Sequence, residues 1–211
     1  MSQYKQLIEK AEKLFNPPWY KKYLGIDYYE ISDLYMKAYK QASTKEEKIF
    51  CLQKAATSYD KCGVKFDAAE CYYNAYKLNN ERDLLVQSTN SFYEIKAYSV
   101  AASKRGELIE EIFAGGKSKI VENKENLHVD LDFVLDCYQL ADMPINSRKY
   151  YFYKGYLLFI DNKKEESKKC FKNASKVHLV KFLEGNKEEF IPNDWIEEEI
   201  CSKSKRVLDI L

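Results

Sequence analysis

The chain has 211 residues, of which 45 % are hydrophobic and 32 % are charged, and its formal net charge is +1. This balance argues against a general nucleic-acid binder, which would carry a broad basic excess. No apolar run reaches the roughly 18 residues that a membrane helix needs. The charged N-terminal stretch lacks the pattern of a signal peptide. We therefore expect a cytoplasmic protein with no membrane-spanning segment.

Cysteine and histidine are arranged in a way that does not favour a metal site. The six cysteines form no CxxC pair, and the chain has only two histidines, so we expect reduced core cysteines, no metal and no cofactor. Gly116-Lys117-Ser118 resembles the end of a phosphate-binding loop, but Glu111 stands where that motif needs glycine. Nothing else suggests a catalytic constellation, so we do not expect an enzyme.

The N-terminal part is predicted to contain two helices separated by an apolar loop. Residues 2–14 have apolar side chains at helical spacing. The loop, residues 15–25, contains two consecutive prolines, which end the helix. Asp27 is expected to cap a helix that reaches about residue 42. Thr44, with Glu47 three residues on, predicts a capping box for the next helix.

Residues 46–78 carry the strongest pattern and predict two helices joined by a turn at Gly63. The pattern consists of small and aromatic residues at Ala56, Tyr59, Ala68, Tyr72 and Ala75. Two helices pack closely only where small side chains remove bulk and rings fill the flanking space. These spacings match the tetratricopeptide repeat, which has a period of about 34 residues.

Further helices are predicted over 80–95 and 97–113, and a polar stretch follows from 114 to about 128. Beyond it, the repeat spacing returns at Val134, Tyr138 and Ala141, and a long helix begins at Pro144. The last helix is expected to begin near residue 193. The sequence thus predicts an all-α fold, a right-handed α-solenoid like tetratricopeptide proteins (residues 1–175) that continues into a small C-terminal helical bundle (176–211).

Two segments have strong charge bias. Residues 148–172 hold eight basic and three acidic side chains, whereas residues 184–199 hold seven acidic and one basic. Solvated helix faces explain each segment alone, but two opposed patches also suit a scaffold that contacts two partners. The loop at 15–25 likewise has two interpretations. It either covers the first helix pair or inserts into a membrane surface, where Trp, Tyr and Lys favour the headgroup layer.

The order of these elements resembles the soluble NSF attachment proteins, the SNAP family. The resemblance is carried by AEKLF with its apolar loop, DYYEISDLYMKAYKQA, CLQKAATSYDKCGVKFDAAECYYNAYKL, YSVAASKRGELIEEIF, SRKYYFYKGYLLFIDN, KKCFKNA and FLEGNKEEF. It implies an adaptor in vesicle-mediated transport and membrane fusion. Such an adaptor is a monomer when free, binds the SNARE four-helix bundle and recruits a hexameric NSF-type AAA ATPase that disassembles it. The chain departs from the family in its shorter middle and in lacking an acidic tail.

The resemblance also implies roles for particular residues. SNARE contact would fall to Lys104, Arg105, Arg148, Lys149 and Lys154. Contact with the ATPase would fall to Glu184, Glu188, Glu189 and Leu211. Peripheral membrane attachment would fall to Phe15, Trp19, Tyr20, Tyr23 and Leu24. The alternative is a tetratricopeptide scaffold or co-chaperone that grips a peptide tail in a groove with Lys, Arg and Asn side chains.

Overall fold

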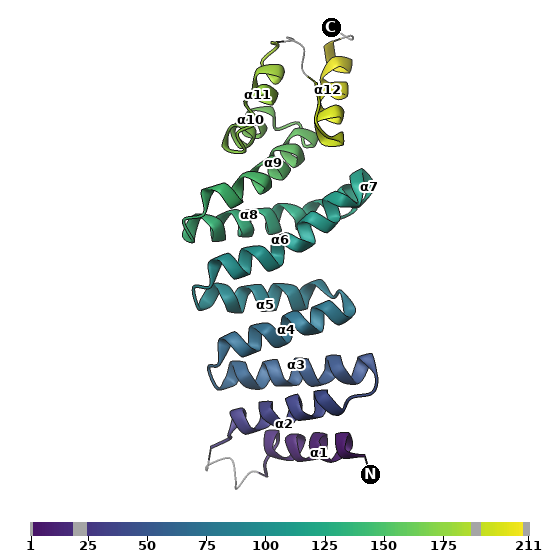
Figure 1. Cartoon of the computed structure of the whole chain (residues 1–211), viewed down its shortest axis with the longest axis vertical. Helices are drawn as coiled ribbons and strands as arrows, with labels where there is room; N and C mark the ends of the chain where they lie inside the picture. The colour runs from purple at the N-terminus through teal and green to yellow at the C-terminus, as the bar shows by residue number, and fades with distance from the viewer. Residues whose placement is uncertain (1, 19–24, 187–190, 209–211) are drawn as a thin grey trace. The chain divides into compact units, whose positions relative to one another are not determined.

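The fold is entirely helical in the part of the chain that the structure describes. The computed structural model describes residues 2–18, 25–186 and 191–208, with side chains of the last helix as far as residue 204. These residues form twelve α-helices and no strand. Successive helices pack on one another (Figure 1). The predicted all-α class, with consecutively packed helices as in an α-solenoid, is confirmed.

The chain divides into two compact units, residues 1–104 and 105–211, which are described separately. In the N-terminal unit the first five helices pack one on the next, from α1 on α2 to α4 on α5. These helices are α1 (Gln3–Phe15), α2 (Tyr28–Gln41), α3 (Lys45–Lys61), α4 (Lys65–Asn79) and α5 (Arg82–Glu94). The boundary between the units falls within α6 (Tyr98–Ala114).

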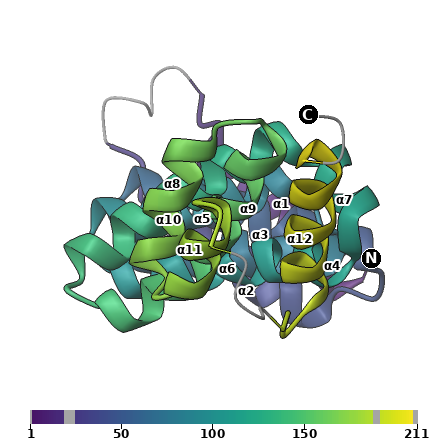
Figure 2. The same ribbon diagram turned by 90° about the horizontal axis from the view of Figure 1, so that it is seen from above.

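The C-terminal unit contains the rest of α6 and six further helices. These are α7 (Gly116–Glu122), α8 (Lys124–Leu140), α9 (Pro144–Ile160), α10 (Lys164–Asn173), α11 (Val177–Leu183) and α12 (Trp195–Leu208). Helix α9 packs against α8, α10 and α12. Helix α12 lies beside α7 in both views (Figures 1 and 2), where Lys117 pairs with Glu199 at 2.6 Å. Helix α11 packs on α10. The predicted division at residue 175 stays a prediction.

Side-chain caps begin the three N-terminal helices. Ser2 caps α1, and Asp27 accepts hydrogen bonds from the first backbone N–H groups of α2. Thr44 and Glu47 form the predicted capping box at the start of α3. Such caps satisfy N–H groups that have no partner within the helix. The helix starts that the sequence predicted at Asp27 and Thr44 are therefore confirmed.

Helix ends repeat one turn conformation in both units. Gly63 has φ +81°, and the next residue, Val64, donates its N–H to the carbonyl of Tyr59 at 2.9 Å. Within the described part of the chain, the same left-handed conformation and the same bond recur at five other turns, where the left-handed residues are Lys96, Asp142, Asn162, Ser175 and Gly185. This Schellman-type closure satisfies the last carbonyls and reverses the chain. The predicted turn at Gly63 is confirmed.

Small residues lie where the helices approach most closely. Ala56, Ala68 and Ala75 are fully buried. In the C-terminal unit, Gly155 takes the same role, because a Cβ atom there would lie 2.6 Å from Cε1 of Phe171. The three alanines are packing positions that the repeat spacing predicted.

The polar stretch from 114 to 128 differs from the prediction because most of it is helical. It forms α7 and the first turn of α8. Ile120 and Leu127 are both fully buried. The sequence has few apolar residues here, and two buried anchors are sufficient to hold a short helix against its neighbours.

Candidate functional site

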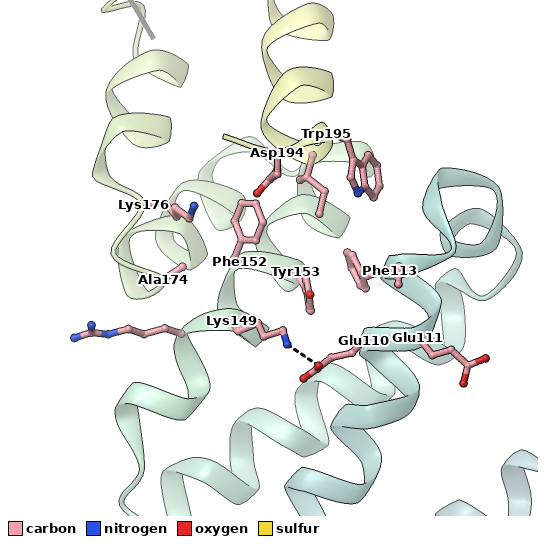
Figure 3. Close-up of a pocket in the computed structure, with 13 residues that line it drawn as sticks. Glu110, Glu111, Phe113, Lys149, Phe152, Tyr153, Ala174, Lys176, Asp194 and Trp195 are labelled. Atoms are coloured by element: carbon pink, nitrogen blue, oxygen red, sulfur yellow. Dashed lines mark ion pairs between the residues drawn. The ribbon is translucent and has the colours of Figure 1, made fainter. Parts of the chain in front are cut away.

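A groove in the C-terminal unit is the best candidate for a functional site. It has a volume of about 800 Å³. Figure 3 shows that it lies between the end of α6, the first half of α9, the turn after α10 and the start of α12. The lining residues are Glu110, Glu111, Phe113, Ala114, Arg148, Lys149, Phe152, Tyr153, Ala174, Lys176, Asp194, Trp195 and Ile196.

Aromatic rings form much of the groove's surface. Phe113 of α6 stacks on Tyr153 of α9, with ring centroids 3.9 Å apart and planes 17° apart. Phe152 lies next to Tyr153, and Trp195 meets Tyr156 edge-on at 5.7 Å. Trp195 remains 38 % exposed. Such a surface can receive large apolar side chains, and its rings are already held by one another before a ligand arrives.

Charged side chains lie around these rings, and most of them are already paired. Lys149 pairs with Glu110 at 2.6 Å, as drawn in Figure 3, and Glu110 also accepts a hydrogen bond from the Tyr150 hydroxyl at 2.9 Å. Burial, together with this bond, raises the pKa of Tyr150. Arg148 is exposed and makes no ion pair within the described part of the chain. It is therefore the cation most available to a ligand.

A buried carboxylate, Glu197, fixes the start of α12 and with it Trp195. Its side chain has no exposed surface, and it accepts bonds from Lys176 at 2.8 Å, His178 at 3.2 Å and the Asn193 backbone at 2.9 Å. Burial alone would raise the pKa of Glu197. The hydrogen bonds outweigh burial and lower that pKa. Glu197 thus joins the turn after α10, helix α11 and helix α12.

Glu199 makes a second link, between α12, α9 and α7. It accepts a hydrogen bond from the Tyr156 hydroxyl at 2.5 Å and pairs with Lys117 at 2.6 Å. Burial would raise the pKa of Glu199, but the bonds from Lys117 and Tyr156 lower it. Lys117 belongs to the Gly-Lys-Ser stretch, so in this structure its ammonium group serves to hold α12.

The residues predicted to contact SNAREs lie in different environments. Lys104 is only 15 % exposed, with its ammonium 3.5 Å from the ring centre of Tyr73 and 3.2 Å from Glu70. Arg105 is 3 % exposed and pairs with the buried Asp130 at 3.4 Å. A guanidinium group in this position cannot reach a partner at the surface. The assignment of Arg105 to a contact surface is therefore corrected: it is a structural residue of the C-terminal unit.

The three basic residues on α9 are more accessible, and they point in different directions. Arg148 and Lys149 are exposed and line the groove. Lys154 is half-buried, pairs with Asp132 of α8 and does not line the groove. The structure thus brings together two of the predicted residues, Arg148 and Lys149. Sequence patterns had not linked them with Phe113, Phe152 or Trp195, which come from three separate helices.

Only part of the other two predicted sites lies within the described residues. Glu184 is exposed at the end of α11. Phe15 is half-buried; it packs edge-on against Tyr28 at 6.1 Å, and the Lys61 ammonium lies 4.2 Å from its ring centre. Phe15 therefore has a packing role within the N-terminal unit. The remaining predicted residues, Glu188, Glu189, Leu211, Trp19, Tyr20, Tyr23 and Leu24, lie outside the described residues.

Five of the six cysteines are buried, and Cys62 is exposed at the end of α3; all six are free thiols. Burial raises the pKa of Cys51 to about 11 and that of Cys71 to about 12. The described residues contain no cluster of histidine, cysteine or carboxylate side chains that could hold a metal ion. Among these same residues, no helix combines the length and apolar character that crossing a membrane requires.

Comparisons with known proteins give a distant likeness among solved structures. No protein-family model matches the chain, and no curated protein matches it. Among solved structures, the crystal structure of BtubC (BKLC) from P. vanneervenii is similar at 14 % sequence identity. The match covers 91 % of this chain and 94 % of that chain, with a TM-score of 0.32. A likeness at this score carries no argument about function.

Proposed function

We propose that this protein is a SNAP-type adaptor that binds SNARE complexes and recruits an NSF-type AAA ATPase. The observation that carries the proposal is the exposed cation Arg148, next to Lys149, at the edge of an aromatic groove. Helical-hairpin proteins act by displaying side chains on a surface, and no catalytic group is needed for this role. Exposed cations beside apolar rings suit the acidic surface of a helical bundle.

The proposal is tested by co-sedimentation with an assembled SNARE bundle, with and without the ATPase. The double variant Arg148→Glu with Lys149→Glu is expected to lose most bundle binding. Because this variant changes the net charge by four, a matched control carries the same two changes at Lys5 and Lys40. Both control residues are exposed on the N-terminal unit. Equal bundle binding by the two double variants would count against the assigned face.

Peripheral membrane attachment through residues 15–25 is a separate part of the proposal. Phe15 packs on Tyr28, so replacing it would perturb folding as well as membrane contact. Trp19→Ser is the better test. It is expected to reduce binding to liposomes while leaving binding to the bundle in solution unchanged. Unchanged liposome binding would assign the loop a structural role.

A tetratricopeptide-type scaffold that holds a peptide is the second candidate function. The observation that favours it is the groove itself, which Arg148, Lys149 and Lys176 line together with aromatic rings. A scaffold of this class binds an isolated peptide, whereas the SNAP-type adaptor requires the assembled bundle. Binding measurements with each ligand separate the two functions.

A further inference from the structure

We infer that the groove binds a protein segment that presents a large apolar side chain beside a carboxylate. The inference rests on the chain being a protein-binding adaptor, but it requires neither a SNARE bundle nor an ATPase. It follows from three observations on the groove: its surface, its remaining charge and its position beside a second hollow.

The surface specifies the apolar part of the ligand. Phe113, Phe152, Tyr153 and Trp195 contribute rings from α6, α9 and α12. A volume of about 800 Å³ can hold several side chains, and it falls within the range of roughly 300–1,000 Å³ found for ligand sites. Aromatic surfaces in such hollows bind large apolar anchors, which dominate the affinity of protein interfaces.

The charge that remains unpaired in the groove indicates that the ligand carries a carboxylate. Lys149 is neutralised by Glu110 at 2.6 Å, and Lys176 is neutralised by the buried Glu197 at 2.8 Å. Of the other lining carboxylates, Asp194 accepts a hydrogen bond from the Glu197 backbone N–H at 2.9 Å, and Glu111 pairs with Lys119 at 3.9 Å. Arg148 has no such partner in the described part of the chain. A guanidinium group binds carboxylates in a two-pronged geometry, which makes an acidic residue its natural ligand.

The second hollow extends the surface past Arg148. It has a volume of about 420 Å³. It is lined by residues of α8, α9 and the turn between them, including Tyr138, Met143 and Tyr151, and by Asn173 and Ser175 at the end of α10. Arg148 lines both hollows. A ligand longer than one side chain can therefore place its apolar anchor among the aromatic rings and its carboxylate at Arg148, then continue along α9. This geometry suits a peptide better than a compact small molecule.

The fluorescence of Trp195 provides a measurement of peptide binding. The chain has two tryptophans, Trp19 and Trp195, so Trp19→Phe leaves a single reporter in the groove. The probe is a short synthetic peptide without Trp or Tyr that carries Leu and Phe one helical turn apart, beside two Glu residues. Two matched peptides serve as comparisons: one has both Glu residues replaced by Lys, and the other has Leu and Phe replaced by Ser.

The acidic peptide is expected to change Trp195 emission in a saturable way, and the two comparison peptides are expected to bind weakly. Arg148→Glu should weaken binding of the acidic peptide about fivefold, which is the upper range for a surface ion pair. The same variant should bind the peptide with Lys more tightly. Lys5→Glu, which changes the charge equally and lies outside the groove, should have no effect. Ala114→Phe adds a ring to an exposed lining position and should block binding without disturbing the core.

Four results would overturn the inference. Three of them are the absence of saturable binding, equal binding of the acidic and Lys peptides, and equal effects of Arg148→Glu and Lys5→Glu. The fourth is strong binding of the peptide without Leu and Phe, because the aromatic surface would then be irrelevant. A failed SNARE pull-down together with positive peptide titrations would reject the SNAP-type function and leave the groove assignment intact.

Discussion

Gly155→Ala tests how closely α9 and α10 pack. The two helices meet at this glycine: Ser167 of α10 donates a hydrogen bond to the Gly155 carbonyl at 2.8 Å, and the ring of the fully buried Phe171 covers its Cα. A Cβ atom would lie 2.6 Å and 2.7 Å from two ring carbons of Phe171. Carbon atoms normally approach to about 3.5–4.0 Å, so the ring must move by about 1 Å.

Two effects of opposite sign determine the size of the change. Alanine is favoured over glycine in a helix by about 1 kcal/mol. Overpacking a buried site costs about 1–3 kcal/mol, and the upper end applies here because a rigid, fully buried ring has to move. We therefore expect Gly155→Ala to lower the free energy of unfolding by about 1–2 kcal/mol, measured by urea unfolding with circular dichroism.

A matched glycine in the same unit provides the control. At Gly115 a new Cβ would meet the Lys119 side chain at 2.2 Å, but that side chain is flexible and exposed and can move away. Gly115 has φ −74°, which alanine adopts readily. Gly115→Ala should therefore change stability by less than about 0.5 kcal/mol. Phe171→Leu should reduce the cost of Gly155→Ala in a double-mutant cycle. If the Gly155→Ala protein is as stable as its parent, α9 and α10 do not approach each other as closely as the structure indicates.

Three further predictions concern stability in urea unfolding. Glu197→Gln should cost about 2–3 kcal/mol at pH 7, because it removes charged hydrogen bonds such as that from Lys176. The lowered pKa of Glu197 implies that its contribution is complete above the ordinary value of 4.5 and is lost as pH falls through the lowered value, so the variant and its parent should converge in acid. Asp130→Ala should cost about 3–5 kcal/mol because it leaves Arg105 charged and buried. The double variant Asp130→Leu with Arg105→Met should cost less, because it leaves no buried charge. Thr44→Ala should cost about 1 kcal/mol through loss of the capping box, with faster hydrogen exchange in the first turn of α3.

Local features were predictable from the sequence because each one depends on neighbours along the chain. The capping box at Thr44 and the turn at Gly63 involve residues only a few positions apart. The alanines at 56 and 68 were found through their repeat spacing. Helix α7 was missed because its stability depends on the burial of Ile120 against other elements, which its own polar composition does not indicate.

The groove could not be predicted because it joins residues that are far apart in the sequence. Phe113 and Tyr153 stack although 40 positions separate them, and Trp195 reaches the groove only because Glu197 fixes the start of α12. Lys104 and Arg105 present the same difficulty. They are adjacent and both basic, yet one contacts Glu70 and the other Asp130, and burial differs between them. The direction in which each side chain leaves its helix, and the helix that it faces there, determine whether the side chain is buried.

The charge displayed to a partner differs from the charge counted along the sequence. In the basic segment 148–172, Lys149, Lys154 and Lys168 are each paired with a carboxylate. In the acidic segment 184–199, Glu197 and Glu199 are bound within the unit. Because these charges are already paired within the unit, each segment attracts an oppositely charged partner less strongly than its count of charged residues implies. Recognition at this unit should therefore depend mainly on fit to the aromatic groove and on Arg148, and should weaken only modestly with salt.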